Sequence, residues 1–246
     1  MKKLIKFFIK KVSTFLRLLY KLKYLITPRE LRRPISDLES RLKENLTDET
    51  FQNFHKHLKK SLLFKKKWHI RAYAINKSLL NDKNKEYFYL EFGVWKGGSA
   101  NFFSKHVNTY YAFDSFQGLN EDWAGTNGNV GSFNLNKKIP KLRSNVMPIV
   151  GWVEDTLDDF LKTHKPKINF IHFDMDTYGP TKYTLEKVKP YLVSNAIIIF
   201  DEFYNYIGWE EGEYKALKEV FKDNEYEYKA FSIENLDGAQ CVIQVK

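Results

Sequence analysis

Two acidic pairs in the second half of the sequence are suited to metal chemistry. Asp174 and Asp176 follow one short apolar run, and Asp201 and Glu202 follow the next one along the chain. If the two runs are neighbouring parallel strands, these acidic ends meet at one edge of a sheet. Carboxylate oxygens suit Mg²⁺, which could orient a substrate hydroxyl and lower its pKa. Solvated carboxylates at strand ends are the competing interpretation.

A glycine-rich turn, Glu91-Phe-Gly93-Val-Trp-Lys-Gly97-Gly98-Ser99, follows another apolar run and could bind a nucleoside. Glycine permits a tight turn and lets a ligand approach the backbone closely. Asp114 ends the following apolar run, where an acidic side chain can accept hydrogen bonds from ribose hydroxyls. The glycine spacing matches neither the dinucleotide-binding pattern nor the P-loop. A purely structural turn is the alternative.

His172 alternates with Asp174 along the same run, so both side chains are expected on one face of a strand. The histidine could assist as a base, but a hydrogen-bonded core histidine is the favoured interpretation. Aromatic side chains that could line an adenine or sugar pocket fall in predicted loops and turns: Trp95, Trp123, Trp152 and Trp209.

The elements that must position these residues alternate between strand and helix from residue 85 onward. The apolar runs predict strands at 87–92, 109–113, 146–150, 168–173 and 196–200, and a closing hairpin at 226–233 and 240–245. The segment 183–193 predicts a helix between the last two of the five strands. Continuous apolar strands of this kind belong to a parallel sheet that is covered on both faces. We therefore predict an α/β fold, with a doubly wound, mostly parallel Rossmann-like sheet and a C-terminal antiparallel hairpin, preceded by N-terminal helices.

The excess of basic residues is concentrated at the N-terminus of the chain. The 246 residues carry a net charge of +10, and residues 1–33 alone hold 11 Lys and Arg against one acidic residue. The rest of the chain is neutral, so its composition gives no case for a nucleic-acid partner. We predict a basic amphipathic helical arm at 1–33, a helical N-terminal region at 34–84 and the α/β domain at 85–246.

The arm has apolar residues at spacings of three and four between residues 4 and 26, with most of its basic residues off that face. Such a helix could lie on an anionic membrane surface, or dock on the body or on a second subunit as a homo-oligomer. Its uncharged runs are too short for a signal peptide or a transmembrane span. A single cysteine, Cys241, fits a reducing compartment. The expected location is cytoplasmic, with peripheral contact at the inner face of a membrane left open.

Five motifs in order resemble class I S-adenosylmethionine-dependent methyltransferases, and are closest to the macrocin/novobiocin-type sugar O-methyltransferases. The segment 90–99 resembles motif I of that class. The segment 114–119 resembles the family's Asp-Ser-Phe-x-Gly-Leu-Pro, with Asn120 in place of the proline, and 151–157 resembles its Gly-x-Phe-x-Asp-Thr-Leu. The segment 174–178, together with Thr181, resembles Asp-x-Asp-x-Tyr-x-Ser-Thr, and 200–203 lies where the family has an Asp-Asp pair. The resemblance makes 85–246 an S-adenosylmethionine-binding methyltransferase domain.

The resemblance also implies a role for each matching residue. Asp174, Asp201 and Glu202 would hold Mg²⁺, with Asp174 also acting as general base beside His172. Asp176 is expected to hold the turn instead. The cofactor S-adenosylmethionine would be bound by Glu91, Gly93, Gly97, Ser99, Asp114, Ser115, Phe116, Trp152 and Glu154.

The predicted function is Mg²⁺-assisted methyl transfer from S-adenosylmethionine to a hydroxyl of a sugar or glycan-like acceptor, either lipid-linked or part of a natural product. Two alternatives stay open. One is a metal-independent methyltransferase acting on a small molecule. The other is a non-catalytic, membrane-associated protein on the same fold.

Overall fold

The computed structural model describes residues 11–12, 14–16, 18–19, 38–233 and 239–246. Of the amphipathic helix predicted at 4–26, residues 11–12, 14–16 and 18–19 are helical, and the others lie outside the described residues. Residues 46–246 form one compact unit, and residues 1–45 are assigned to another. No helix in the described ranges is both long enough and apolar enough to cross a lipid bilayer.

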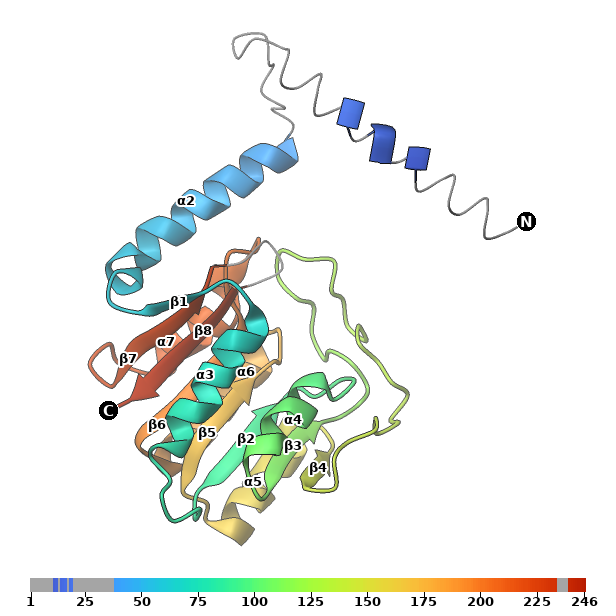
Figure 1. Cartoon of the computed structure of the whole chain (residues 1–246). Helices are drawn as coiled ribbons and strands as arrows, with labels where there is room; N and C mark the ends of the chain where they lie inside the picture. The colour runs from blue at the N-terminus through green and yellow to red at the C-terminus, as the bar shows by residue number, and fades with distance from the viewer. Residues whose placement is uncertain (1–10, 13, 17, 20–37, 234–238) are drawn as a thin grey trace. The chain divides into compact units, whose positions relative to one another are not determined.

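In the described part of the chain, eight strands form one sheet in the order β1-β7-β8-β6-β5-β2-β3-β4 (Figure 1). The strands β6, β5, β2, β3 and β4 are parallel neighbours, whereas β8 runs antiparallel between β6 and β7. The strand bounds are β1 Leu62–Phe64, β2 Phe88–Phe92, β3 Tyr110–Asp114, β4 Val146–Val150, β5 Ile168–Phe173, β6 Leu192–Tyr204, β7 Tyr226–Ser232 and β8 Ala239–Val245.

Helices cover both faces of the sheet (Figure 1). One apolar core lies between the sheet and helices α3 and α4, and a second lies between the sheet and helices α5, α6 and α7. The end of α2 joins the second core through the buried Phe54. The helix bounds are α2 Leu38–Leu58, α3 Lys67–Leu79, α4 Gly98–Phe103, α5 Val153–His164, α6 Tyr178–Val188 and α7 Glu213–Val220.

Alternation along the strands decides which side chains enter which core. In β6, Ile197 and Ile199 pack in the α3 core, whereas Ile198 and Phe200 pack in the opposite core. Successive side chains of a strand point to opposite faces. Asp201 therefore continues the row of side chains that faces α3. His172 of β5 follows Phe170 onto the same face, and Glu91 is its register partner on β2.

The predicted fold class is confirmed: the sheet is mostly parallel, with an antiparallel pair at the C-terminus and helices before it. Three elements differ from the sequence prediction. The short strand β1 lies inside the region predicted to be helical, and its partner β7 is far along the chain. Helix α5 was not predicted, and α6 begins at Tyr178 rather than at Tyr183. The Gly179-Pro180 pair is typical of a turn, but proline is tolerated in the first turn of a helix.

The close approach of β2 and β5 leads to a prediction about Gly93. Its φ is +87°, and a Cβ atom built there would lie 1.7 Å from the carbonyl oxygen of Asp174. Gly98, in the same turn, has open space around its Cβ position. Gly93→Ala is expected to lower the free energy of unfolding by at least about 2 kcal/mol because it combines an unfavourable φ with a steric clash. Gly98→Ala is the matched control and should change it by less than about 1 kcal/mol. Urea unfolding of both variants tests this, and equal stabilities would contradict it.

Candidate active site

A cavity of about 400 Å³ lies at the carboxyl ends of the parallel strands. Gly93 follows β2, Asp114 ends β3, Trp152 follows β4 and Asp174 follows β5, and all four residues line it. Helix α3 supplies a further wall through Lys67, Trp68 and Arg71. The volume lies in the range of small-molecule sites, about 300–1,000 Å³.

The predicted cofactor-binding residues divide into two groups. Those that line the cavity are Gly93, Ser99, Asp114, Ser115, Trp152 and Glu154, whereas Glu91, Gly97 and Phe116 do not. Glu91 is fully buried, and its Oε1 accepts a hydrogen bond from the hydroxyl of Ser99. Gly97 precedes α4 with a φ of +76°. These residues support the cavity wall from outside the cavity.

Asp114 organises the two turns that form the floor of the cavity. Its Oδ2 accepts from the backbone amides of Val94 at 2.8 Å and Trp95 at 2.7 Å, and its Oδ1 accepts from the amide of Phe116 at 2.6 Å. Trp95 and Phe116 have φ values of +44° and +55°, which are unfavourable for residues with a Cβ. Three hydrogen bonds to one carboxylate hold these strained turns in place. Backbone strain of this kind is often found at functional sites.

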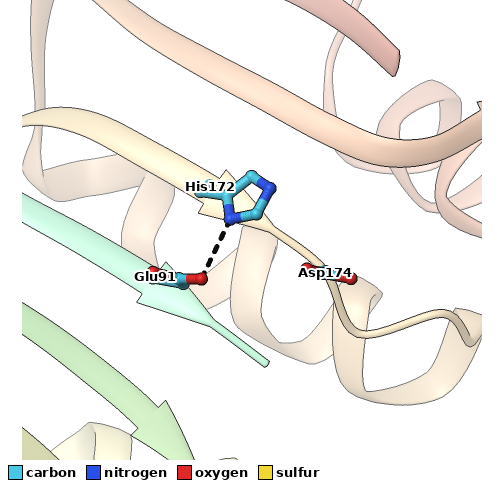
Figure 2. A group of neighbouring side chains, drawn as sticks. All are labelled: Glu91, His172 and Asp174. Carbon is cyan, nitrogen blue, oxygen red and sulfur yellow. Dashed lines mark hydrogen bonds and ion pairs between the residues drawn. The ribbon is translucent and has the colours of Figure 1, made fainter. Parts of the chain in front are cut away.

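His172 lies between two buried carboxylates. Its Nδ1 is 3.2 Å from Oε1 of Glu91 (Figure 2), and its Nε2 is 3.2 Å from Oδ1 of Asp201. Burial alone would lower its pKa, but the hydrogen bonds to Asp201 and Glu91 outweigh that effect and raise the pKa to about 9. The imidazole is therefore protonated at neutral pH and donates from both nitrogens. It has no free lone pair with which to act as a base or bind a metal.

Arg71, on α3, completes this buried network. Its Nη2 lies 2.5 Å from Oδ1 of Asp201, and Gln240 of β8 donates to the same oxygen. Burial would raise the pKa of Asp201, but the charges of Arg71 and His172 lower it well below its usual range. Asp201 is therefore ionised, with one oxygen fully engaged.

The sequence analysis missed Arg71 because it lies in the region 34–84, outside the predicted α/β domain. A signal was present in the sequence. Arg71 shares the buried face of α3 with Ala74, Ile75 and Ser78, at spacings of three and four residues. A charged residue on an otherwise uncharged helix face requires a buried partner.

A second group of carboxylates lies at the end of β5 and along β6. Oxygen atoms of Asp174, Asp176 and Glu202 all lie within 4.8 Å of one another. Burial, and next the charge of Asp201, raise the pKa of Asp174 to about 7. Burial and neighbouring carboxylates also raise the pKa values of Asp176 and Glu202. Oε2 of Glu202 is buried and has no hydrogen-bond partner among the described residues.

The predicted metal ligands are thus brought together in part. Asp174 and Glu202 meet, and Asp176 is the third member, although the sequence analysis assigned it to the turn. Asp201 is adjacent but is paired with Arg71. A divalent cation fits the cluster of Asp174, Asp176 and Glu202, because it would relieve the repulsion between the three carboxylates and provide a partner for Glu202. Glu91, His172 and Asp174 are also within 4.8 Å of one another, but the protonated His172 makes them a poor metal site.

Four tryptophans contribute to the cavity: Trp68, Trp95, Trp123 and Trp152. The sequence analysis named the last three and missed Trp68, which lies on α3. Trp209 belongs to the core instead, because it is 1% exposed and packs against Phe54 and Tyr214 with ring centroids 5.6 and 4.8 Å apart.

Comparisons with known proteins agree with this architecture. Residues 90–203 match the family model described as a methyltransferase domain. The fold is similar to CalS11, a calicheamicin methyltransferase, with a TM-score of 0.57 and 17% identity over 89% of this chain and 96% of that chain. It is also similar to the O-methyltransferase NovP, with a TM-score of 0.51 and 19% identity over 72% of this chain and 78% of that chain. No curated protein sequence matches the chain significantly.

The resemblance seen in the sequence motifs is thereby confirmed. The fold is similar to that of these two methyltransferases, and residues 90–203 match the methyltransferase-domain model.

The protonated state of His172 predicts a pH dependence of stability. Its pKa is about 9 in the folded protein and 6.5 in the unfolded chain. The stabilisation from this group is therefore complete below pH 6.5 and is lost as the pH rises through 9. Unfolding free energies measured between pH 6 and 9.5 should fall more steeply for the wild type than for His172→Gln. His69→Gln, at an exposed histidine, should keep the wild-type slope. Identical slopes for wild type and His172→Gln would contradict the assignment.

Proposed function

We propose that this protein transfers the methyl group of S-adenosylmethionine to a hydroxyl of a sugar or glycan-like acceptor, with a divalent cation such as Mg²⁺ at the acceptor. One observation carries the proposal. A single cavity is lined by the glycine-rich turn after β2 and by the carboxylate cluster at the ends of β5 and β6. The two partners of a methyl transfer would then lie side by side.

The cofactor would occupy the side of the cavity formed by Gly93, Asp114 and Trp152. S-adenosylmethionine supplies a methyl group on a positively charged sulfur, which makes it ready for transfer. Gly93 lets a ligand approach the strand end, and Trp152 offers an aromatic face to an adenine ring. Asp114 already accepts three backbone hydrogen bonds, which hold the turns in the conformation that receives the cofactor.

Asp174 is the residue we assign to proton removal. It lies just beyond β5 and lines the cavity, where its carboxylate can accept the proton of an acceptor hydroxyl (Figure 2). Asp176 and Glu202 would share the cation with it, bringing the acceptor oxygen close to the base. The assigned role of His172 is to position Glu91 and Asp201, since both of its nitrogens face carboxylates. Catalysis would rest on alignment and electrostatics.

The aromatic walls favour a ring-shaped acceptor. Trp68, Trp95 and Trp123 line the cavity, and the flat surfaces of indole rings pack well against the apolar faces of sugars. One similar structure is described as a TDP-rhamnose 3'-O-methyltransferase, which acts on a sugar hydroxyl; its TM-score is 0.50 at 17% identity. This likeness supports the class of acceptor without naming it.

A metal-independent form of the same reaction is the second candidate. The observation that favours it is the ion pair of Arg71 and Asp201, which takes one predicted ligand away from the metal. The two candidates differ in their response to a chelator.

Calorimetry and thermal melting of the full chain test the proposal. S-adenosylmethionine is expected to bind in the micromolar range, and Mg²⁺ is expected to raise the melting temperature. Glu202→Gln should abolish the Mg²⁺ effect because it removes a charged ligand. Asp159→Asn, at a carboxylate that is 87% exposed, should leave it unchanged. A folded protein that binds no S-adenosylmethionine would overturn the proposal, whereas binding with no response to Mg²⁺ would select the metal-independent candidate.

A further inference from the structure

The cavity has a second wall whose chemistry is opposite to that of the carboxylates. Lys67 and Trp68 come from the first turn of α3, and Trp95 and Lys96 come from the turn after β2. Each lysine is thus next to a tryptophan in the sequence, and all four residues line the same cavity as the acidic cluster. These four residues form a basic and aromatic part of the cavity lining, and the carboxylate cluster forms an acidic part.

Positively charged side chains lie close to the tryptophan rings of this wall. The Nζ of Lys96 lies 4.1 Å from the centroid of the Trp95 ring, and the Nζ of Lys67 lies 6.0 Å from that of Trp68. The guanidinium of Arg71 lies 4.9 Å from the same Trp68 ring. Trp68 and Trp95 are each 43% exposed. Two tryptophans that are half open to solvent, beside the ammonium groups of Lys67 and Lys96, form a surface that can bind a ligand carrying both a ring and a negative charge.

The positive charge of this wall is not neutralised by the protein. Among the described residues, neither Lys67 nor Lys96 has a carboxylate within ion-pair distance, whereas lysines elsewhere, such as Lys182 and Lys215, do. The first turn of α3 holds no acidic residue, and no side chain caps it. Nε of Arg71, in a residue that is 3% exposed, has no hydrogen-bond partner in the described structure.

We infer that the acceptor is a phosphorylated sugar, whose phosphate is bound by Lys67 and Lys96 while Trp68 and Trp95 contact the ring attached to it. The inference rests on the proposed function, because it names the acceptor of that same site. Lysine binds phosphate as a point charge, and two lysines match the charge of a phosphate or diphosphate ester. The phosphate could link the sugar to a nucleoside or to a lipid.

The charge pattern would also orient the acceptor. A phosphate is repelled by Asp174, Asp176 and Glu202 and attracted by the two lysines, so only a neutral hydroxyl end of the ligand faces the carboxylates. The same pattern rejects a ligand that enters in the opposite direction. Binding energy from the phosphate, which does not react, would then hold the hydroxyl in line with the methyl group.

A titration of inorganic pyrophosphate into the full chain tests the inference. S-adenosylhomocysteine keeps the cofactor side filled, EDTA prevents a cation from binding pyrophosphate at the carboxylates, and 0.15 M salt weakens binding to the basic arm. Lys67→Glu and Lys96→Glu are each expected to weaken pyrophosphate binding at least tenfold. The matched control is Lys105→Glu, an exposed lysine outside the cavity, which should change the affinity less than twofold.

Equal affinities in the three variants would overturn the inference, because binding would then reflect net charge alone. Tighter binding of sodium glucuronate than of pyrophosphate would also overturn it, since the site would then select a carboxylate. Wild-type protein that binds S-adenosylhomocysteine but not pyrophosphate would contradict this inference and leave the proposed function standing. Failure to bind S-adenosylhomocysteine would contradict the proposed function itself.

Two larger probes then identify the source of the phosphate. UDP-glucose represents a nucleoside-linked sugar, and farnesyl diphosphate in detergent represents a lipid-linked phosphate. Tighter binding of either one than of pyrophosphate, lost in Lys67→Glu, supports the inference and assigns the linkage. Weaker binding of both than of pyrophosphate would overturn the inference, because the subsite would then not accept an esterified phosphate.

Discussion

The buried carboxylate of Asp201 is the point on which the rest of the site depends. It lies at the edge of the sheet where the strands end, and it is charged inside the protein. A buried charge is tolerated only when it is paired and hydrogen-bonded. Arg71, His172 and Gln240 supply these partners from three different elements, α3, β5 and β8. The requirement to neutralise one carboxylate thus fixes where three elements meet.

The same network connects the two halves of the cavity. His172 links Asp201 to Glu91, and Glu91 holds Ser99 at the start of α4, beside the glycine-rich turn. On the other side, Arg71 places the first turn of α3, and therefore Trp68 and Lys67, on the cavity wall. The buried carboxylates outnumber the two buried cations, Arg71 and His172. This excess of negative charge favours a divalent ion near Asp174. The same set of buried charges thus determines how the elements pack and where the proposed cation would bind.

The sequence was sufficient to predict the sheet because its strands are continuous apolar runs that end in acidic or glycine-rich turns. The residues that line the cavity from those turns, such as Gly93 and Asp174, followed from the same pattern. The contribution of α3 could not be predicted in this way. Arg71 is 130 residues away from Asp201 along the chain, and no local pattern connects them. The strand β1 was hidden for the same reason, since its three residues are ordered by pairing with β7.

Sequence spacing alone could not show which of Asp176 and Asp201 belongs to the candidate cation site. Both aspartates follow apolar runs, so their positions in the sequence are equivalent. A φ of +63° at Asp176 accompanies its place beside Asp174 and Glu202, whereas Asp201 lies on the face of β6 that meets Arg71. Local backbone conformation and the neighbouring helix decide which carboxylate is open to a cation. Neither can be derived from residue types alone.

The most direct test of this account is a double-mutant cycle on Arg71 and Asp201, followed by urea unfolding. Arg71→Met and Asp201→Asn should each lower the free energy of unfolding by about 3–5 kcal/mol, because each leaves a buried charge without its partner. The double variant should lose much less than the sum of the two. Lys182→Met, which breaks an exposed pair with Glu219, should lower the free energy of unfolding far less. Additive losses, or a loss for Arg71→Met as small as that for Lys182→Met, would contradict the central role of the buried pair.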